Sequence, residues 1–186
     1  MNSDAVDEVR AVLASLRGVF DDTEPVDELD HALQSAARAL ATGADRDLVL
    51  AALLHDCGRS PAVAAAHPGV PHEQSAAAWI GSRFGERAGW LAGAHVAAKQ
   101  HLVATDPAYA AGLSQASTAS LVVQTGRAPD ISAFVTHPWW DDALRLRRWD
   151  DAAKVPGAVT PDVDAVLAAI GLSDDIEGSD DDGGGA

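Results

Sequence analysis

The chain has 186 residues, a formal net charge of −15 at pH 7 and a single cysteine. An acidic chain is repelled by nucleic acid and by anionic lipid, so binding to polyanions is not expected. One cysteine excludes an intrachain disulfide, no apolar run approaches the length of a membrane span, and the first residues are acidic where a signal peptide is basic. These features predict a cytoplasmic protein that binds neither nucleic acid nor membrane.

The composition changes sharply near the C-terminus. Residues 173–186 combine repeated acidic residues with glycine and contain almost no apolar side chains. Such a segment cannot bury enough surface to offset the entropy lost on ordering. We therefore expect one domain over residues 1–172 and a disordered acidic tail over residues 173–186.

Apolar residues recur at helical spacing along most of the remaining chain. Asp45 or Asp47 is expected to cap the third helix, residues 62–71 to form a loop or a short helical piece, and Pro161 to open the last helix. Strand-like alternation is absent apart from the ambiguous residues 121–123, so the sequence predicts an all-α helical bundle. The expected helices cover residues 6–19, 27–42, 48–54, 72–84, 87–102, 114–124, 130–136, 140–153 and 161–170.

The adjacent residues His55 and Asp56 end the apolar helical run 48–54. Neighbouring residues of a helix project about 100° apart, so His55 can hold one metal ion while Asp56 turns towards a second and bridges the pair. Any one histidine of this chain could be a scattered polar residue. Four of them, however, lie on separate predicted helices, and a bundle can aim such side chains at one internal point. The candidate ligands of a two-metal site are His31, His55, Asp56, His72, His95 and Asp150.

Imidazole and carboxylate ligands suit iron, zinc, manganese or nickel better than calcium. Cys57 directly follows His55 and Asp56, but we expect it to be a small buried apolar residue and not a metal ligand. His67, His101 and His137 have no partner at a useful spacing and are left out of the site.

Two basic residues share helix faces with candidate ligands. Lys99 follows His95 by four residues, and Arg147 precedes Asp150 by three. A helical lysine is often only a solvated surface charge. In a chain with 13 basic residues, two cations that face metal ligands favour an anionic substrate group held beside the metals.

These residues resemble the H…HD…D pattern of the HD-domain superfamily, with the extra histidines of its dinuclear branch. Within that branch the chain is similar to the mixed-valent di-iron oxygenases, particularly the phosphonate-cleaving PhnZ type, and more distantly to myo-inositol oxygenase. The likeness covers roughly residues 20–156. Its most specific strings are HVAAKQ at residues 95–100, LSQAS at residues 113–117 and LRRWDDAAK at residues 146–154.

The resemblance implies an HD-domain helical bundle that holds an Fe²⁺/Fe³⁺ pair on the six candidate ligands. The implied activity is an oxygenase that uses O₂ to cleave the C–P bond of a small hydroxylated organophosphonate and releases phosphate. By position, Lys99, Ser117 and Arg147 match residues that hold the phosphonate. Glu24 matches an acidic residue of a substrate-responsive loop, and it joins Asp56 and Arg59 as an expected catalytic residue.

The sequence departs from the resembled pattern at two positions. The phosphonate enzymes commonly read HD-x-G-H, whereas this chain has Arg59 in place of the last histidine, and Asp21 replaces a loop tyrosine three residues before Glu24. Arg59 lies one turn after His55 and can face the pocket. As a third cation there, it would favour a substrate with a second acidic group and disfavour an ammonium group.

The same six ligands fit a second kind of enzyme. A dinuclear metal-dependent phosphohydrolase uses two divalent ions to activate water against a nucleotide or another phosphate ester. A metal-stabilised binding protein without activity is a third reading, which is disfavoured because no ligand is missing. Consumption of O₂ distinguishes the oxygenase from the hydrolase.

Overall fold

The computed structural model describes residues 3–21, 24–125 and 131–172, so the expected acidic tail lies outside the described residues. Regular structure in these ranges is helical throughout, which confirms the predicted all-α class. The helices are α1 (Ser3–Ser15), α2 (Glu28–Ala41), α3 (Arg46–Leu54), η1 (Cys57–Arg59), α4 (Pro61–Ala66), α5 (His72–Phe84), α6 (Glu86–Gly93), α7 (His95–Thr105), α8 (Pro107–Gly112), α9 (Gln115–Thr125), α10 (Ser132–Val135), α11 (Trp140–Ala152) and α12 (Val163–Ala169).

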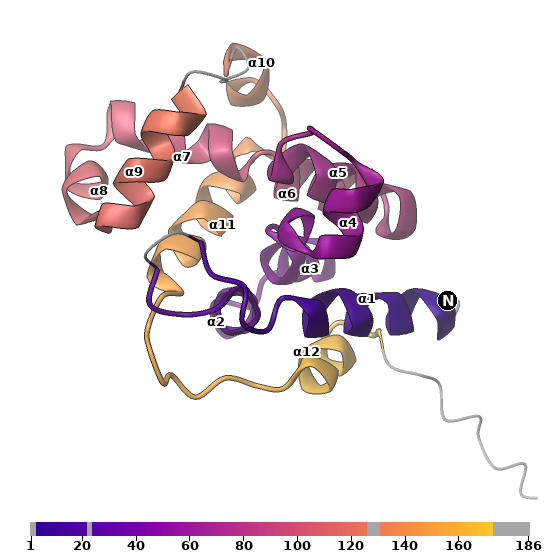
Figure 1. Ribbon diagram of the computed structural model, residues 1–186. Helices are drawn as coiled ribbons and strands as arrows, with labels where there is room; N and C mark the ends of the chain where they lie inside the picture. Colours follow the sequence, from indigo (N-terminus) through magenta and orange to yellow (C-terminus); the bar gives the residue numbers. More distant parts are fainter. Residues whose placement is uncertain (1–2, 22–23, 126–130, 173–186) are drawn as a thin grey trace, which may run out of the picture.

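Helix α3 is the centre of the bundle. Every residue from Leu48 to Leu54 is buried, because α2, α5, α6 and α11 pack around this helix (Figure 1). Its N-terminus is capped by Asp45, whose carboxylate accepts a hydrogen bond from the backbone N–H of Leu48 at 3.2 Å. Burial on all sides fixes α3, and therefore fixes His55, which directly follows it.

Glycines allow the close contacts that place α5. A Cβ atom on Gly89 of α6 would lie 2.8 Å from the Cα of Gly81 on α5. A Cβ atom on Gly58 of η1 would lie only 2.0 Å from the carbonyl oxygen of His72. The residue two positions after Asp56 must therefore lack a side chain, so that the first residue of α5 can approach it.

The single helix expected over residues 87–102 is wrong. The chain forms two helices there, α6 and α7, which meet at Ala94. Gly93, which has low helix propensity, packs tightly at this junction, since a Cβ atom on it would lie 2.9 Å from the Cβ of Ala77. As a result His95 is the first residue of α7 and does not lie in mid-helix.

Other boundaries also differ from the expectation. Helix α1 ends at Ser15, before a turn in which Gly18 has a φ of +76°. Helix α12 begins at Val163 and not at Pro161, because the carboxylate of Asp162 caps it by accepting from the N–H of Ala165 at 2.7 Å. Helix α4 agrees with the short helical piece that was one of two alternatives for residues 62–71, whereas α8 lies outside the expected helices.

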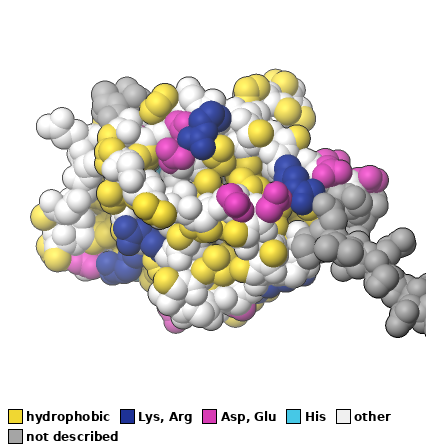
Figure 2. All heavy atoms as spheres, turned by 90° about the horizontal axis from the view of Figure 1, so that it is seen from below, with side chains coloured by type: hydrophobic (Ala, Val, Ile, Leu, Met, Phe, Trp, Pro, Cys, Tyr) yellow, Lys and Arg dark blue, Asp and Glu magenta, His cyan; other side chains and the backbone are white. Residues whose placement is uncertain are grey.

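The surface carries mixed charges on the face seen in Figure 2, where basic side chains lie beside acidic ones. One such contact joins α1 to α12, since Arg10 donates to Asp164 at 2.8 Å and to Asp7 at 2.9 Å. Among the described helices, every one is too short or too polar to cross a bilayer.

Candidate metal centre

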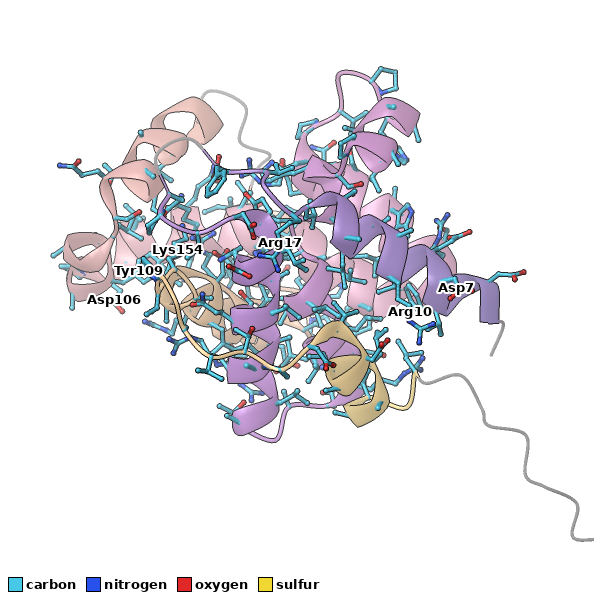
Figure 3. The ribbon with its side chains drawn as sticks, turned by 60° about the horizontal axis from the view of Figure 1, so that its bottom comes forward. Asp7, Arg10, Arg17, Asp106, Tyr109 and Lys154 are labelled. Carbon is cyan, nitrogen blue, oxygen red and sulfur yellow. The ribbon has the colours of Figure 1, made fainter. Side chains whose placement is uncertain are left out.

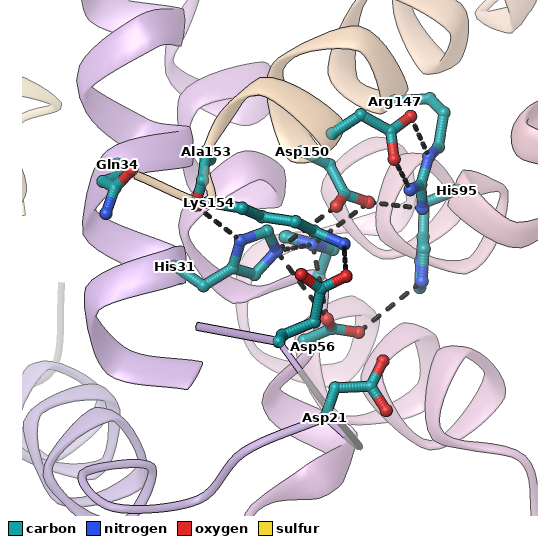
Figure 4. Close-up of polar contacts among 12 residues, drawn as sticks. Asp21, His31, Gln34, Asp56, His95, Arg147, Asp150, Ala153 and Lys154 are labelled. Atoms are coloured by element: carbon teal, nitrogen blue, oxygen red, sulfur yellow. Dashed lines mark hydrogen bonds and ion pairs between the residues drawn. The ribbon is translucent and has the colours of Figure 1, made fainter. Parts of the chain in front are cut away.

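One half of the candidate centre lies deep between α2, α3 and α11. We call His31, His55 and Asp150 the inner half. The Nε2 atoms of His31 and His55 are 3.2 Å apart. They lie 3.3 Å and 3.5 Å, respectively, from the two carboxylate oxygens of Asp150. Three ligand atoms thus converge on one buried point, as Figure 4 shows for His31 and Asp150.

The other half lies between η1, α5 and α7. We call His72, His95 and the Oδ1 atom of Asp56 the outer half. The two Nε2 atoms are 3.3 Å apart, and they lie 3.1 Å (His72) and 3.6 Å (His95) from Asp56 Oδ1. The second oxygen of the same carboxylate, Oδ2, lies 3.6 Å from His55 Nε2 and 3.9 Å from His31 Nε2. Asp56 therefore faces both halves, with one oxygen towards each.

The remaining ring nitrogens of these histidines face acceptors. Backbone carbonyl oxygens lie 3.0 Å from Nδ1 of His31 (Ala153), 3.0 Å from Nδ1 of His55 (Ala52) and 2.6 Å from Nδ1 of His95 (Ala92). Nδ1 of His72 lies 3.4 Å from the carboxylate of Glu73. A carbonyl or carboxylate oxygen accepts a hydrogen bond from Nδ1–H, so the lone pair of a neutral imidazole is left on Nε2. All four Nε2 atoms are therefore set up as ligands.

The donor set fits a pair of metal ions. Asp56 Oδ1 is buried and has no hydrogen-bond donor among the described residues. Burial opposes ionisation of Asp56 and Asp150. Nearby positive charges outweigh this effect and hold both pKa values well below the usual range: those of Arg59 and His55 act on Asp56, and those of Arg147 and His55 act on Asp150. Burial also disfavours a charged His55, but Asp56 and Asp150 raise its pKa to about 9. The cluster thus favours positive charge at its centre, which metal ions would supply.

A pocket of about 420 Å³, including its open mouth, leads to the centre. Its wall contains the candidate ligands except His55, and it also contains most of the other residues expected from the sequence. The lining residues are Asp21, Glu24, Val26, Glu28, His31, Asp56, Arg59, His72, His95, Lys99, Arg147, Asp150 and Lys154.

Basic side chains gather on one side of this pocket. Lys99 is 3% exposed, and burial together with the charge of Arg147 lowers its pKa to about 8. Lys154 donates to Glu24 Oε1 at 2.6 Å and to Ser117 Oγ at 2.9 Å. The predicted Glu24, Lys99 and Ser117 thus lie on the same side of the centre, together with a lysine that had not been predicted (Figure 4 shows Lys154).

Arg147 is buried as well, at 4% exposed. Its Nη1 atom lies 2.6 Å from Asp150 Oδ2, and its Nε atom donates to Asp151 Oδ2 at 2.9 Å and to the Tyr109 hydroxyl at 3.2 Å. Tyr109 in turn donates to Asp151. Arg147 lines the pocket as expected, and its guanidinium also orients the ligand Asp150.

Arg59, at the end of η1, lines the same pocket and has different partners from these cations. Its two Nη atoms donate to the two carboxylate oxygens of Asp21 at 2.9 Å and 2.8 Å. Its Nε atom lies 3.4 Å from Glu28 Oε1 and 3.5 Å from Asp56 Oδ1. The guanidinium faces the pocket as expected, but three carboxylates surround it, so it is not a third uncompensated cation.

Comparison with known proteins gives this geometry a chemical context. No family model matches the sequence. The chain is 36% identical over 150 residues, 75% of its length and 74% of the relative's, to hydroxymethylphosphonate dioxygenase of Gimesia maris. It is 32% identical over 146 residues, again 75% and 74% of the two lengths, to [1-hydroxy-2-(trimethylamino)ethyl]phosphonate dioxygenase (glycine-betaine-forming) of Leisingera caerulea.

The chain belongs to the phosphonate dioxygenase family. It is therefore an enzyme of the oxygenase type, and the resemblance stated from its motifs is confirmed. Membership also supports metal binding by the buried histidine and aspartate clusters.

Two charged residues of this phosphonate dioxygenase pocket were not predicted from the sequence. Lys154 follows the end of α11, so helical spacing from Asp150 could not place it. Glu28 is 4% exposed, and one of its oxygens lies near His31 and Asp56. Its position three residues before His31 on α2 is a signal that could have found it.

The histidines left out of the site do lie away from it. His137 stacks on Trp90 with ring centroids 3.9 Å apart, and His101 packs edge-on against Trp140 at 5.4 Å. His67 Nδ1 donates to the carbonyl of Val63 within α4 and its C-cap. Cys57 is fully buried, and burial raises its pKa, as expected of an inert thiol.

Proposed function

We propose that the protein is an iron-dependent dioxygenase that cleaves the C–P bond of a small 1-hydroxyphosphonate. One O₂ is consumed for each bond broken: the hydroxylated carbon leaves as a carboxylate and phosphorus leaves as phosphate, which accounts for both oxygen atoms. The observation that carries the proposal is Asp56, whose two oxygens face two separate groups of histidines. The names of the two phosphonate-cleaving relatives support this reaction over phosphoester hydrolysis.

His31, His55 and Asp150 would hold one iron ion, His72 and His95 would hold the other, and Asp56 would contact both. Bound iron supplies the electron transfer that activation of O₂ requires. Five of the six candidate ligands line the pocket, and the side chains of His72 and Asp56 are the most exposed of them, at 19% and 12%. Substrate would therefore approach beside His72 and Asp56, where its hydroxyl group can reach the centre.

The basic side of the pocket would bind the phosphonate group. Lys99 and Lys154 both line the pocket, and the charge of Lys154 is among the causes that lower the pKa of Lys99. An anion placed there relieves the repulsion between the two lysines. Glu24 forms an ion pair with Lys154 in the structure, so a bound phosphonate would replace Glu24 as the partner of Lys154.

The substrate is then held at two points. With its phosphonate on the lysines and its hydroxyl at the centre, the C–P bond lies between the two, and the reacting carbon is brought close to the ions. Positioning of this kind can supply a large part of the rate enhancement. Arg147 would act on the reaction through Asp150, which it holds in place.

The test is to load anaerobically purified protein with iron and to assay phosphate release and O₂ uptake with hydroxymethylphosphonate. We expect one phosphate per O₂ and two iron ions per chain, detected by metal analysis and electron paramagnetic resonance. A phosphate ester such as a nucleoside monophosphate serves as the second substrate. Release of phosphate from that ester without O₂ uptake, and none from the phosphonate, would identify a hydrolase and overturn the proposal.

A further inference from the structure

The ion pair between Asp21 and Arg59 closes one side of the pocket. Two parallel hydrogen bonds of 2.9 Å and 2.8 Å join them. The pair connects η1, which directly follows Asp56, to the segment between α1 and α2. A fork-to-fork contact of this kind has a fixed geometry as well as a favourable energy, so it makes a defined wall.

This wall and the basic side chains occupy different parts of the pocket lining. Figure 4 shows Asp21 and Arg147 at opposite ends of the cluster, with Asp56 between them. Arg59 is bound to Asp21 at the first end, whereas Lys99 lies near the charges of Arg147 and Lys154. The lining therefore contains a group that can take an anion and a group that is internally paired.

Further contacts restrain Arg59. Its Nε atom is 3.4 Å from Glu28 and 3.5 Å from Asp56, while both of its Nη atoms are bound to Asp21. Moving the guanidinium aside would therefore separate it from three carboxylates at once. The side chain is a stiff barrier and not a flexible surface arginine.

We propose that the Asp21–Arg59 pair is the size stop of the pocket, which limits the substituent on the hydroxylated carbon to hydrogen or another very small group. This inference rests on the proposed function. A substrate whose phosphonate lies on Lys99 and Lys154 and whose hydroxyl reaches the centre must aim its remaining substituent at Arg59. The two positions at which the sequence departs from the resembled motif are the two partners of this pair.

The two named relatives differ in this substituent. One is named for hydroxymethylphosphonate, which has only hydrogen there, and the other for a substrate with a trimethylaminomethyl group. The pair assigns this chain to the small-substrate class. It also leaves Asp21 engaged by Arg59, and therefore not available to hold an ammonium group.

The experiment compares iron-loaded wild type with Arg59→Ala on hydroxymethyl-, 1-hydroxyethyl- and 1-hydroxypropylphosphonate and on the trimethylamino substrate. We expect the wild type to prefer the first by about 10-fold or more per added carbon, since a misfitting methylene in a pocket changes kcat/KM by about that factor. Arg59→Ala should reduce this preference by at least 10-fold. A wild type that turns over the larger compounds equally well, or an unchanged preference in the variant, would overturn the inference.

A second variant protects the test against misfolding. Arg59→Ala leaves three carboxylates close together, whereas the double variant Asp21→Ala/Arg59→Ala removes one charge of each sign and should show the same relaxed preference. Arg59→Lys keeps the charge but loses the fork, and should relax the preference less. Arg10→Ala is the matched control, because Arg10 also joins two elements by ion pairs and lies far from Lys154 and Tyr109 (Figure 3).

Binding separates this inference from the proposed function. Methyl-, ethyl- and propylphosphonate lack the hydroxyl group and do not need to react, so their affinities can be measured by calorimetry. A size preference in the wild type that Arg59→Ala removes supports the size stop even if no hydroxyphosphonate is turned over, in which case only the proposed function fails. Equal affinities for the three compounds in wild type and variant would overturn the size stop.

Discussion

The two halves of the candidate centre use similar ligands in different surroundings. In the inner half the side chains of His55 and Asp150 are 1% and 4% exposed, whereas in the outer half those of His72 and Asp56 are 19% and 12% exposed. His95 of the outer half resembles the inner histidines, because it is 3% exposed and has a backbone carbonyl on Nδ1. The halves therefore differ at Asp56 and at His72, whose Nδ1 has only the more distant carboxylate of Glu73. Rigid ligands surrounded by core favour retention of a metal, and exposed ligands favour its exchange and contact with substrate.

Removing the shared ligand should have the largest effect. Asp56→Ala takes one oxygen from each half, so we expect loss of both ions and of all activity. Metal analysis after anaerobic reconstitution measures the first effect, and phosphate release measures the second. Two ions retained in this variant would contradict the bridging role. Asp142→Ala, which removes a carboxylate bound to Arg87, is the control.

Single histidine variants should distinguish the halves. His72→Ala should lose the outer ion, keep the inner one and melt close to the wild type. His55→Ala should lose the inner ion and also lower the melting temperature, since this side chain is fully buried behind α3 and metal binding is coupled to folding. Metal content and thermal unfolding, with and without a chelator, measure these effects. Equal loss of metal from His72→Ala and His55→Ala would contradict the assignment of these residues to separate metal ions.

Lys154→Met should leave both halves loaded and weaken substrate binding. A hydrogen bond to a charged group contributes about 1.5–3 kcal/mol, so we expect KM for the phosphonate to rise about 10- to 150-fold. Steady-state kinetics and iron content are measured on the same sample. Arg148→Met, which removes a basic residue bound to Asp106 on the surface, is the control. Loss of iron from Lys154→Met would show that Lys154 contributes to metal binding, which contradicts the prediction.

Gly58→Ala should disturb the outer half through the backbone. The added methyl group would overlap the carbonyl oxygen of His72 at 2.0 Å, and relief of such overlap in a packed region costs about 1–3 kcal/mol. We expect weaker binding of the outer ion with the inner ion retained, measured by titration with a chelator. Gly112→Ala, at a site with nothing within 4 Å of the added atom, should bind metal like the wild type.

Asp45→Ala should have the smallest effect, a loss of about 1 kcal/mol of stability with normal metal content, since it removes the cap of α3 and an exposed ion pair with Arg87. Its hydrogen bond to Arg87 holds the pKa of Asp45 below the usual value. The stabilisation is therefore present above the pKa of the unfolded chain and is lost as pH falls through the lower pKa of the folded protein. Denaturant unfolding from pH 7 down to pH 3 should show the variant and the wild type converging.

The clustering of the candidate ligands could be predicted because their chemistry resides in residue type and helical spacing. His31, His55, His72 and His95 lie on four different helices or their ends, as the sequence indicated. The break at Ala94 was not predicted, because it depends on the packing of Gly93 against α5. Local patterns carry no information about such tertiary contacts.

The pocket wall was harder to predict than the ligands. Asp21 and Arg59 were noticed as departures from a motif, yet their pairing joins residues 38 positions apart. The expectation that Arg59 acts as a free third cation failed for this reason, since its charge is compensated by Asp21, Glu28 and Asp56. The expected contact of Arg147 with the substrate stays a prediction, and the structure adds its contacts with Asp150 and Asp151.

Helix α2 also fixes the position of Lys154 relative to the inner half of the candidate centre. Its residue Gln34 binds both backbone groups of Val155, donating to the carbonyl and accepting from the N–H at 3.0 Å each. One turn earlier, His31 binds the carbonyl of Ala153. Lys154 is thus clamped on both sides by the helix that carries an inner ligand (Figure 4). Under the proposed function, α2 would set the distance between the metal centre and the phosphonate, and would favour substrates whose hydroxyl and acidic groups are separated by that distance.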